Sequence, residues 1–249
     1  MVASLPKKLR QEPLIDALFE VRFSSKSPTS VIFPGVLFNS LPGSKEIVPL
    51  SAAQMPKQIR DADPVLKFAP VARLDWGQFA ISISDFSVLV GCKLPYPGWI
   101  NFRPVIILVM DELRKTNIVQ NVERYSLKYV DLIPGIDPQQ QISFVNFEVN
   151  VAGHNLEKEI FQFRIEILKD GFINAVNLVS SATVTVEGQT AKHGLVIDID
   201  TIANQNNIPL LDVLVDFPAK LDQIHESNKQ MFFDCLNSKA LALLEPIYE

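Results

Sequence analysis

The sequence predicts an α+β fold of two similar halves, each an antiparallel curved sheet followed by a long helix packed on one face of that sheet. Runs of alternating apolar and polar residues recur along the chain, as in strands with one buried face. Each half closes with a longer segment of helical periodicity. A stretch rich in proline and glutamine, residues 134–142, separates the halves as a linker. One compact domain with a single continuous sheet is the alternative.

The first half covers residues 13–133, and its clearest strand alternates Phe19, Val21 and Phe23 with charged neighbours. Residues 1–12 carry three basic side chains without apolar periodicity, which predicts a mobile arm or a short edge piece. Further strands are predicted at residues 66–74, 78–84, 86–93 and 124–133. Helices are predicted at residues 34–41 and 101–115, and the irregular stretch 44–64 is expected to be mobile or to hold a short helix at 51–60.

The second half covers residues 143–249. The dipeptide Asp170-Gly171 predicts a tight hairpin, because glycine permits the positive φ that such turns need. Strands are predicted at residues 143–151, 161–169, 171–179, 182–186 and 194–202. A closing helix is predicted over residues 213–244, with Pro218 near its start.

Several motifs, in a fixed order along nearly the whole chain, support a family resemblance. Residues 13–23 read Pro-Leu-Ile-Asp-Ala-Leu-Phe-Glu-Val-Arg-Phe. Residues 96–99 read Tyr-Pro-Gly-Trp and are followed by Phe102, and residues 124–130 read Arg-Tyr-Ser-Leu-Lys-Tyr-Val. The last motif is the closing helix around His225 and Phe232. In this order the motifs resemble a sporadically distributed family of uncharacterised bacterial proteins.

The resemblance implies little about chemistry, because that family has no agreed activity and no established catalytic residues. Its scattered occurrence is similar to that of mobile or defence-related gene sets, which implies partners encoded nearby rather than a housekeeping enzyme. Two residues depart from the family pattern. Asp16 stands where glutamate is common, and Asp131 stands where asparagine is frequent.

Composition narrows the class of protein. A net charge of −5 and a pI near 5.3 argue against nucleic acid as a direct ligand. The only two cysteines have no metal-type spacing, and we expect a reducing, cytoplasmic location. The longest apolar run, residues 105–110, is far shorter than the roughly 20 residues that cross a bilayer, so no membrane association is expected.

No metal, cofactor or catalytic constellation is predicted. His154, His193 and His225 are far apart and none has a neighbour at ligand spacing. Asp198 and Asp200 lie on one side of a strand and could hold Mg²⁺ with a third acid, but their apolar neighbours favour an ordinary half-exposed strand.

The cysteines and one set of charges have plain structural interpretations. Cys92 lies on the apolar phase of a strand and Cys235 on the apolar stripe of a helix, which predicts buried, unreactive thiols. A polar array is predicted if the strands that carry it are neighbours, and cross-strand ion pairs would be its ordinary role. Its members would be Glu20, Arg22, Glu123, Arg124 and Lys128.

Three functions remain open. The preferred one is a non-enzymatic interaction or adaptor protein, an accessory subunit of a multi-protein bacterial system that binds itself or a co-encoded protein. Its candidate contact residues are Tyr96, Trp99 and Phe217, at two proline-containing corners. The second is a module that senses a small or apolar ligand between sheet and helix. The third is an enzyme whose site, built on Asp198, Asp200 and a histidine, is not visible in sequence.

Overall fold

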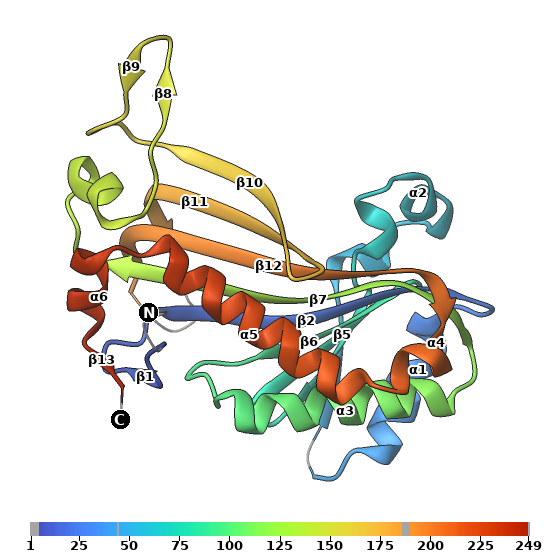
Figure 1. Cartoon of the computed structure of the whole chain (residues 1–249). Helices are drawn as coiled ribbons and strands as arrows, with labels where there is room; N and C mark the ends of the chain where they lie inside the picture. Colours follow the sequence, from blue (N-terminus) through green and yellow to red (C-terminus); the bar gives the residue numbers. More distant parts are fainter. Residues whose placement is uncertain (1–4, 44, 186–189, 249) are drawn as a thin grey trace. The chain divides into compact units, whose positions relative to one another are not determined.

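A computed structural model describes residues 5–43, 45–185 and 190–248 (Figure 1). In chain order the strands are β1 (Lys8–Leu9), β2 (Leu14–Ser25), β3 (Lys45–Pro49), β4 (Ala72–Trp76), β5 (Phe79–Ile83), β6 (Ser87–Cys92), β7 (Val119–Pro134), β8 (Asn150–Val151), β9 (His154–Asn155), β10 (Gln162–Lys169), β11 (Phe172–Val184), β12 (Lys192–Pro209) and β13 (Pro246–Ile247). The helices are α1 (Thr29–Ser40), α2 (Lys57–Ala62), α3 (Trp99–Lys115), α4 (Leu210–Leu214), α5 (Phe217–Cys235) and α6 (Ser238–Leu244), with 3-10 turns η1 (Ser51–Gln54), η2 (Leu66–Phe68) and η3 (Pro138–Phe144).

The chain forms two compact units, each built from segments that are distant in sequence. The first unit is Met1–Ile15, Lys128–Thr201 and His225–Glu249, and the second unit is Asp16–Leu127 and Ile202–Ile224. Among the described residues, nine strands follow the sheet order β10-β11-β12-β7-β2-β6-β5-β4-β3. By their bounds, β2, β7, β12 and α5 have residues in both units.

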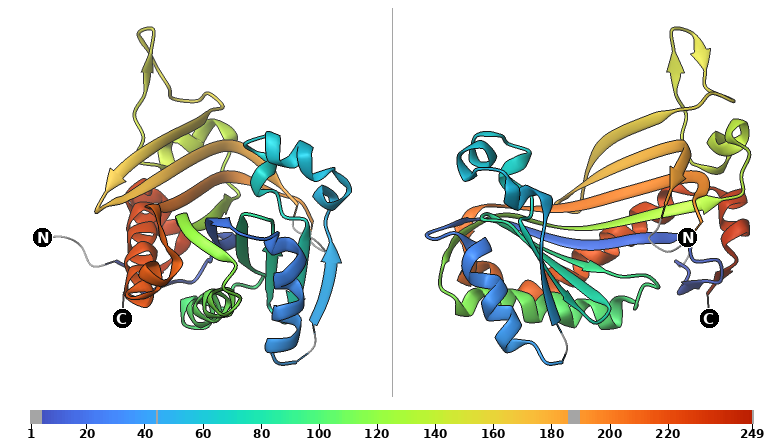
Figure 2. Two further views of the ribbon diagram at one scale, coloured as in Figure 1. Left: turned by 90° about the vertical axis from the view of Figure 1, so that its right-hand side faces the viewer. Right: turned by 180° about the vertical axis from the view of Figure 1, so that it is seen from behind.

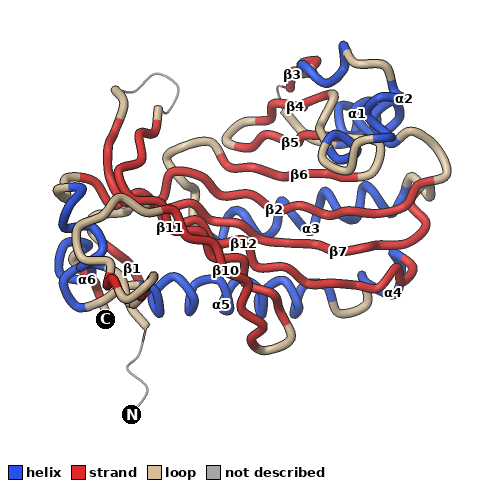
Figure 3. The backbone as a smooth tube through the Cα atoms, turned by 90° about the horizontal axis from the view of Figure 1, so that it is seen from above, coloured by secondary structure: helices blue, strands red, loops and turns tan. Residues whose placement is uncertain are grey.

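The second unit packs helices on its sheet, whose strands can be followed from β7 to β3 in Figure 3. In Figure 2, α1 and α3 lie on one face of these strands and α2 lies on the other. The odd positions from Ala17 to Phe23 in β2 are at most 2% exposed, as strand alternation requires. Met110 of α3 and Phe33 of α1 are buried with them. The second unit therefore has its own apolar core.

The first unit has a separate core, formed by the strands β7, β10, β11 and β12 together with the last turns of α5 and α6. Its fully or nearly buried members include Ile133, Leu195, Ile197, Phe232 and Ala240. Gly194 of β12 is required here by close approach, because a Cβ at this position would lie 2.2 Å from the backbone oxygen of Ile133.

A buried polar network ties α5 to the sheet of the first unit. The Asn228 side-chain amide donates to the Ile199 backbone oxygen at 3.0 Å and to Thr201 Oγ1 at 3.0 Å. The Thr201 hydroxyl in turn donates to Asn174 Oδ1 at 2.8 Å. All three polar side chains are nearly inaccessible to solvent. Buried polar atoms of this kind need such partners, so the network fixes how α5 sits on these strands.

The mixed class of antiparallel strands and helices is confirmed. The strand predicted around residues 13–23 is β2, and the helix predicted at residues 101–115 is α3. β10 and β11 meet at the predicted hairpin, where Asp170 and Gly171 have φ values of 52° and 81°. A short helix near residues 51–60 is also present, as η1 and α2.

The predicted closing helix at residues 213–244 is wrong as one element, because it is broken into α4, α5 and α6. Pro218 lies in the first turn of α5, as expected, and the break before it falls at Val215 and Asp216. The second break falls at Asn237, whose side chain accepts hydrogen bonds from the backbone nitrogens of Lys239 and Ala240 and so starts a new helix.

Three further elements differ from their predicted bounds. The helix predicted at 34–41 begins at Thr29, so that Pro34 lies inside it and is buried. The strand predicted at 143–151 is replaced by the end of η3 and the two-residue β8. The strand predicted at 66–74 begins only at Ala72, after η2. The early start of the first of these, α1, buries Thr29 and Phe33, so packing outweighs the local pattern there.

Two predicted segments end in residues that the structure does not describe. Lys8 and Leu9 of the N-terminal segment form β1, which pairs with β13, while residues 1–4 lie outside the described residues. β11 continues to Val184 where two strands were predicted, and residue 186 lies outside the described residues.

The finer expectation of two similar halves, each a sheet followed by its helix, is not confirmed. Each compact unit takes strands and helix turns from distant parts of the chain. That residues 134–142 form a linker between domains stays a prediction. The 3-10 turn η3 begins inside this stretch, at Pro138, and ends after it, at Phe144.

Candidate functional site

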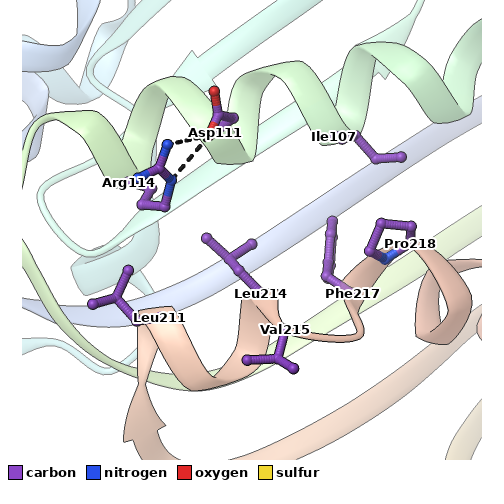
Figure 4. A pocket seen from close by; sticks show the side chains of 8 residues that line it. All are labelled: Ile107, Asp111, Arg114, Leu211, Leu214, Val215, Phe217 and Pro218. Carbon is purple, nitrogen blue, oxygen red and sulfur yellow. Dashed lines mark hydrogen bonds and ion pairs between the residues drawn. The ribbon is translucent and has the colours of Figure 1, made fainter.

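A hollow of about 310 Å³ lies in the second unit between α3 and the α4–α5 corner (Figure 4). We call it the α3–α4 groove. Figure 4 shows Ile107 projecting from α3 toward the opposite wall, and Leu214 and Phe217 on the α4–α5 side. The residues that line it are Ile107, Asp111, Arg114, Leu211, Leu214, Val215, Phe217 and Pro218.

The groove combines a buried floor with exposed apolar walls. Phe217 is 1% exposed and packs edge-on against Phe19 and Tyr125, with ring centroids 5.9 and 5.5 Å away. Leu211 is 64% exposed and Val215 is 84% exposed. Large apolar side chains that gather in the open are typical of surfaces that another molecule covers.

The sequence places these residues in the open because α4 is apolar on more than one side. Residues 210–215 contain five apolar side chains, whereas a short helix on a surface can bury only one stripe of them. Leu210 and Val213 take the buried positions. Leu211 and Val215 are left outside. This excess of apolar residues could have indicated the groove from the sequence. It was missed because residues 213–244 were predicted to form one long helix.

One rim of the groove is charged. Arg114 donates from Nε and Nη2 to Asp111 Oδ1, at 2.9 and 2.7 Å. Lys115 lies 2.9 Å from the other oxygen of Asp111. Hydrogen bonds from Lys115 and Arg114 hold the pKa of Asp111 below its ordinary value, so this acid is ionised at neutral pH. The cations of this rim are therefore already neutralised.

The opposite rim carries acids without such partners. Asp212 and Asp216 are exposed, and neither makes an ion pair with another described residue. Burial, and then the negative charge of Asp216, raises the pKa of Tyr125 to about 12. The Tyr125 hydroxyl is thus neutral, and the exposed acids of the α4–α5 rim are Asp212 and Asp216.

The predicted contact residues lie in this unit, in unlike surroundings. Trp99 is half-buried at the start of α3 and donates from Nε1 to Asp222 Oδ1 at 3.2 Å. Tyr96 is half-buried, with its ring 6.3 Å from that of Phe102. Phe217 belongs to the floor of the groove. Their role in binding stays a prediction, and the exposed groove residues Leu211 and Val215 were missed.

Three of the five charged residues predicted as a polar array come together on β2 and β7. Glu20 Oε2 accepts from Arg22 Nε at 2.8 Å and from Arg124 Nη2 at 2.9 Å. Glu20 is buried, and the Arg22 guanidinium lies 4.2 Å from the centre of the Phe68 ring. This triad is a structural ion cluster that connects two strands and η2.

The other two members of the predicted array have different partners. Glu123 lies 3.9 Å from Lys67, and Lys128, in the first unit, lies 2.9 Å from Asp198. Asp198 is one of the two acids considered for a metal site. The Lys128 ammonium lies beside its carboxylate, where a metal ion would have to bind.

A second ionic cluster holds α2 in place. Asp85 is buried and accepts from the Ser30 hydroxyl at 2.5 Å, while Lys57 and Arg60 of α2 lie 3.3 and 3.8 Å away. The hydrogen bond to Asp61, ahead of smaller effects from Asp85, raises the pKa of Lys57, which stays charged. The cluster attaches a short helix that has no buried residue of its own.

The histidines do not converge. His154 lies 2.8 Å from Glu159, and His193 lies 2.8 Å from the Thr183 hydroxyl. The His225 ring packs edge-on against the ring of Tyr129. Within the described residues, no group of three or more histidine, cysteine or acidic side chains could hold a metal ion.

Both cysteines are free thiols, and each is half-buried rather than fully buried as predicted. Burial, followed by the charge of Asp16, raises the pKa of Cys92 to about 12. Burial, followed by the charge of Asp234, raises the pKa of Cys235 to about 12. At neutral pH almost no thiolate is present at either site, which agrees with the predicted structural role.

Comparison with models of known protein families and with curated proteins found no match to this chain. In the described part of the chain, every helix is too short or too polar to cross a membrane.

Proposed function

We propose that this chain is a non-enzymatic interaction protein, an accessory subunit of a multi-protein bacterial system, and that it binds a protein partner through the α3–α4 groove. The observation that carries the proposal is the exposure of Leu211 and Val215, 64% and 84%, beside a hollow of about 310 Å³. The family resemblance supports an accessory role beside partners encoded nearby, and the two cysteines without metal-type spacing favour a cytoplasmic location.

The shape of the groove favours a helix as the bound element. Its walls are the helices α3 and α4, and its floor includes the buried Phe217 ring. An amphipathic helix laid in such a groove inserts apolar side chains at successive turns. It would remove the exposed side chains of Leu211 and Val215 from water, which contributes roughly 25 cal/mol for each Å² of apolar surface covered.

The charges around the groove indicate the chemistry of that partner. Arg114 and Lys115 are engaged by Asp111, whereas Asp212 and Asp216 have no ion-pair partner among the described residues. A partner helix with an apolar ridge and a lysine or arginine beside it would satisfy both features. Charge pairs at the rim affect the association rate and specificity more than affinity.

The second candidate function is a sensor for a small apolar ligand. The volume of the hollow, about 310 Å³, lies at the lower end of the range for sites that enclose such ligands. A sensor should carry its ligand through gentle purification, and native mass spectrometry would then give a mass of 27.9 kDa plus a few hundred daltons. An enzyme built on Asp198 gains no support from the Lys128 contact.

The experiment places a photo-crosslinking residue at position 215 in the producing host, and at Val65 as an equally exposed control in the same unit. We expect one defined protein to be captured at position 215 and not at 65. With that protein purified, Leu211→Asp should raise its dissociation constant at least about tenfold, and Val65→Asp should leave it unchanged. Equal capture at both positions, or wild-type affinity of Leu211→Asp, would overturn the proposal.

A further inference from the structure

A second surface, in the first unit, is suited to a different contact. β10 is the terminal strand of the sheet order, and β11 is its hydrogen-bonded neighbour among the described strands (Figure 1). Five of its eight residues are exposed: Gln162, Arg164, Ile165, Glu166 and Leu168. It contains no proline, so each residue carries a backbone donor and an acceptor. Such a long edge is a template for pairing with another strand.

The alternating hydrogen bonds between β10 and β11 determine which backbone groups of β10 face outward. Just before β10, the Phe161 backbone oxygen accepts from the Ser180 backbone nitrogen at 3.0 Å, which makes these residues a hydrogen-bonded pair. In an antiparallel ladder such pairs alternate, so the odd-numbered residues of β10 direct their backbone groups to β11. The backbone groups of Gln162, Arg164, Glu166 and Leu168 therefore point to the free edge.

The side chains on this edge are charged in a self-complementary order. Arg164 donates from Nη2 to Glu166 Oε1 at 2.9 Å, so the two lie on one face of the strand, and both are exposed. Ile165, on the other face, is 43% exposed, between Phe163 and Ile167, which pack on the core of the first unit. Leu168 is 76% exposed.

We infer that β10 is the contact between two copies of this chain, paired antiparallel about a two-fold axis at Ile165. In this register Arg164 lies opposite Glu166 of the second copy, and Glu166 lies opposite Arg164 of the second copy. Both residues direct their backbone groups outward, so each such pair can exchange two hydrogen bonds. On the other face Ile165 meets Ile165 of the second copy, and Phe163 meets Ile167 of the second copy.

The charges select this register from its neighbours. Outward backbone groups must face one another, so the strands can shift only by steps that keep even-numbered residues opposite even-numbered ones. The next register in one direction places Arg164 opposite Arg164 of the second copy. The next in the other direction places Glu166 opposite Glu166 of the second copy. Like charges directly opposite destabilise a strand pair, so only the register centred on Ile165 is favoured.

The test uses charge exchange and analytical ultracentrifugation of the full chain. We expect the wild type to shift with concentration from 27.9 kDa toward twice that mass. Arg164→Glu and Glu166→Arg should each raise the dimer dissociation constant at least about tenfold, because each places like charges opposite one another. An equimolar mixture of the two variants should form a dimer, and the double exchange should restore self-association. Lys239→Glu, an equal charge change at an exposed site on α6, is the matched control.

A wild type that stays at the mass of one chain throughout the accessible concentrations would overturn the inference. So would a dimer that both single exchanges leave intact, since it would have to form through another surface. Circular dichroism of each variant confirms that loss of the dimer is not loss of the fold. The α3–α4 groove lies in the other unit, so its variants should not change this dimer.

Discussion

Arg103 of α3 holds the carboxylate of Asp222 of α5 with two hydrogen bonds, from Nε to Oδ1 at 2.7 Å and from Nη2 to Oδ2 at 2.9 Å. The same Nη2 donates to the Pro218 backbone oxygen at 3.1 Å. The indole Nε1 of Trp99 also donates a hydrogen bond to Asp222 Oδ1, at 3.2 Å. A two-pronged contact of this kind fixes orientation as well as distance. It sets the first turn of α5 beside α3, and so shapes the α3–α4 groove.

Replacing Asp222 with alanine should weaken this contact without unfolding the protein. Because Asp222 is nearly half exposed, we expect the free energy of unfolding to fall by only about 1 kcal/mol. Urea denaturation should show a lower midpoint with an unchanged m-value. Asp61→Ala, which removes an exposed pair with Lys57 on α2, is the control and should have a smaller effect. Equal losses in the two variants would contradict an orienting role for Asp222.

The Glu20 cluster should contribute more to stability, because it is buried. Glu20→Ala would leave Arg22 and Arg124 together without their shared carboxylate. We expect a loss of about 2 to 3 kcal/mol in the free energy of unfolding, measured by urea denaturation. Asp61→Ala, which removes an exposed ion pair with Lys57, provides the control. A Glu20→Ala loss no greater than that of Asp61→Ala would argue against the cluster.

Asp131 should make stability depend on pH. Burial, followed by the charge of Glu12, raises the pKa of Asp131 from 3.8 to about 8. Between these values the folded chain holds a proton that the unfolded chain releases, so the free energy of unfolding falls as pH rises through this window. Asp131→Asn supplies a neutral side chain of similar shape. It should stabilise the protein at pH 7 by at least about 1 kcal/mol and have little effect near pH 4.

Thermal unfolding of the Asp131→Asn variant and the wild type, from pH 4 to pH 8, measures this effect. The two melting temperatures should diverge as pH rises. Parallel profiles would mean that Asp131 is ionised in the folded protein.

The thiols should react slowly in the folded protein. Because the pKa values of Cys92 and Cys235 are raised to about 12, alkylation at pH 8 should be at least about a hundredfold slower than for an exposed thiol. The added cysteine of Ser238→Cys, at an exposed position on α6, supplies the fast reference in the same chain. Labelling in urea should make all the thiols fast. Rapid labelling of Cys92 in the folded chain would mean that its segment opens readily.

Local sequence patterns were sufficient to predict an element where the structure of that element depends mainly on its own residues. The alternation around Phe19 predicted β2, and the dipeptide Asp170-Gly171 predicted the turn between β10 and β11. Helical periodicity predicted α3. These elements depend on side-chain period and turn chemistry, which neighbouring residues encode.

Partners across the fold could not be predicted in the same way. Glu20, Arg22 and Arg124 were predicted to meet if their strands were neighbours, but nothing local assigned Glu123 to Lys67 or Lys128 to Asp198. Those pairs depend on the order and register of strands. A change of register by one residue would turn each side chain to the opposite face.

The sequence alone determined the strand β2, the hairpin turn at Asp170-Gly171, the long helix α3 and the charge order along β10. Only the tertiary structure decided that Leu211 and Val215 stay exposed beside α3, and that β10 is the terminal strand of the sheet among the described residues. The physical reason is that exposure and edge position depend on which distant segments cover a residue. Periodicity describes one segment, and coverage is a property of the packed chain.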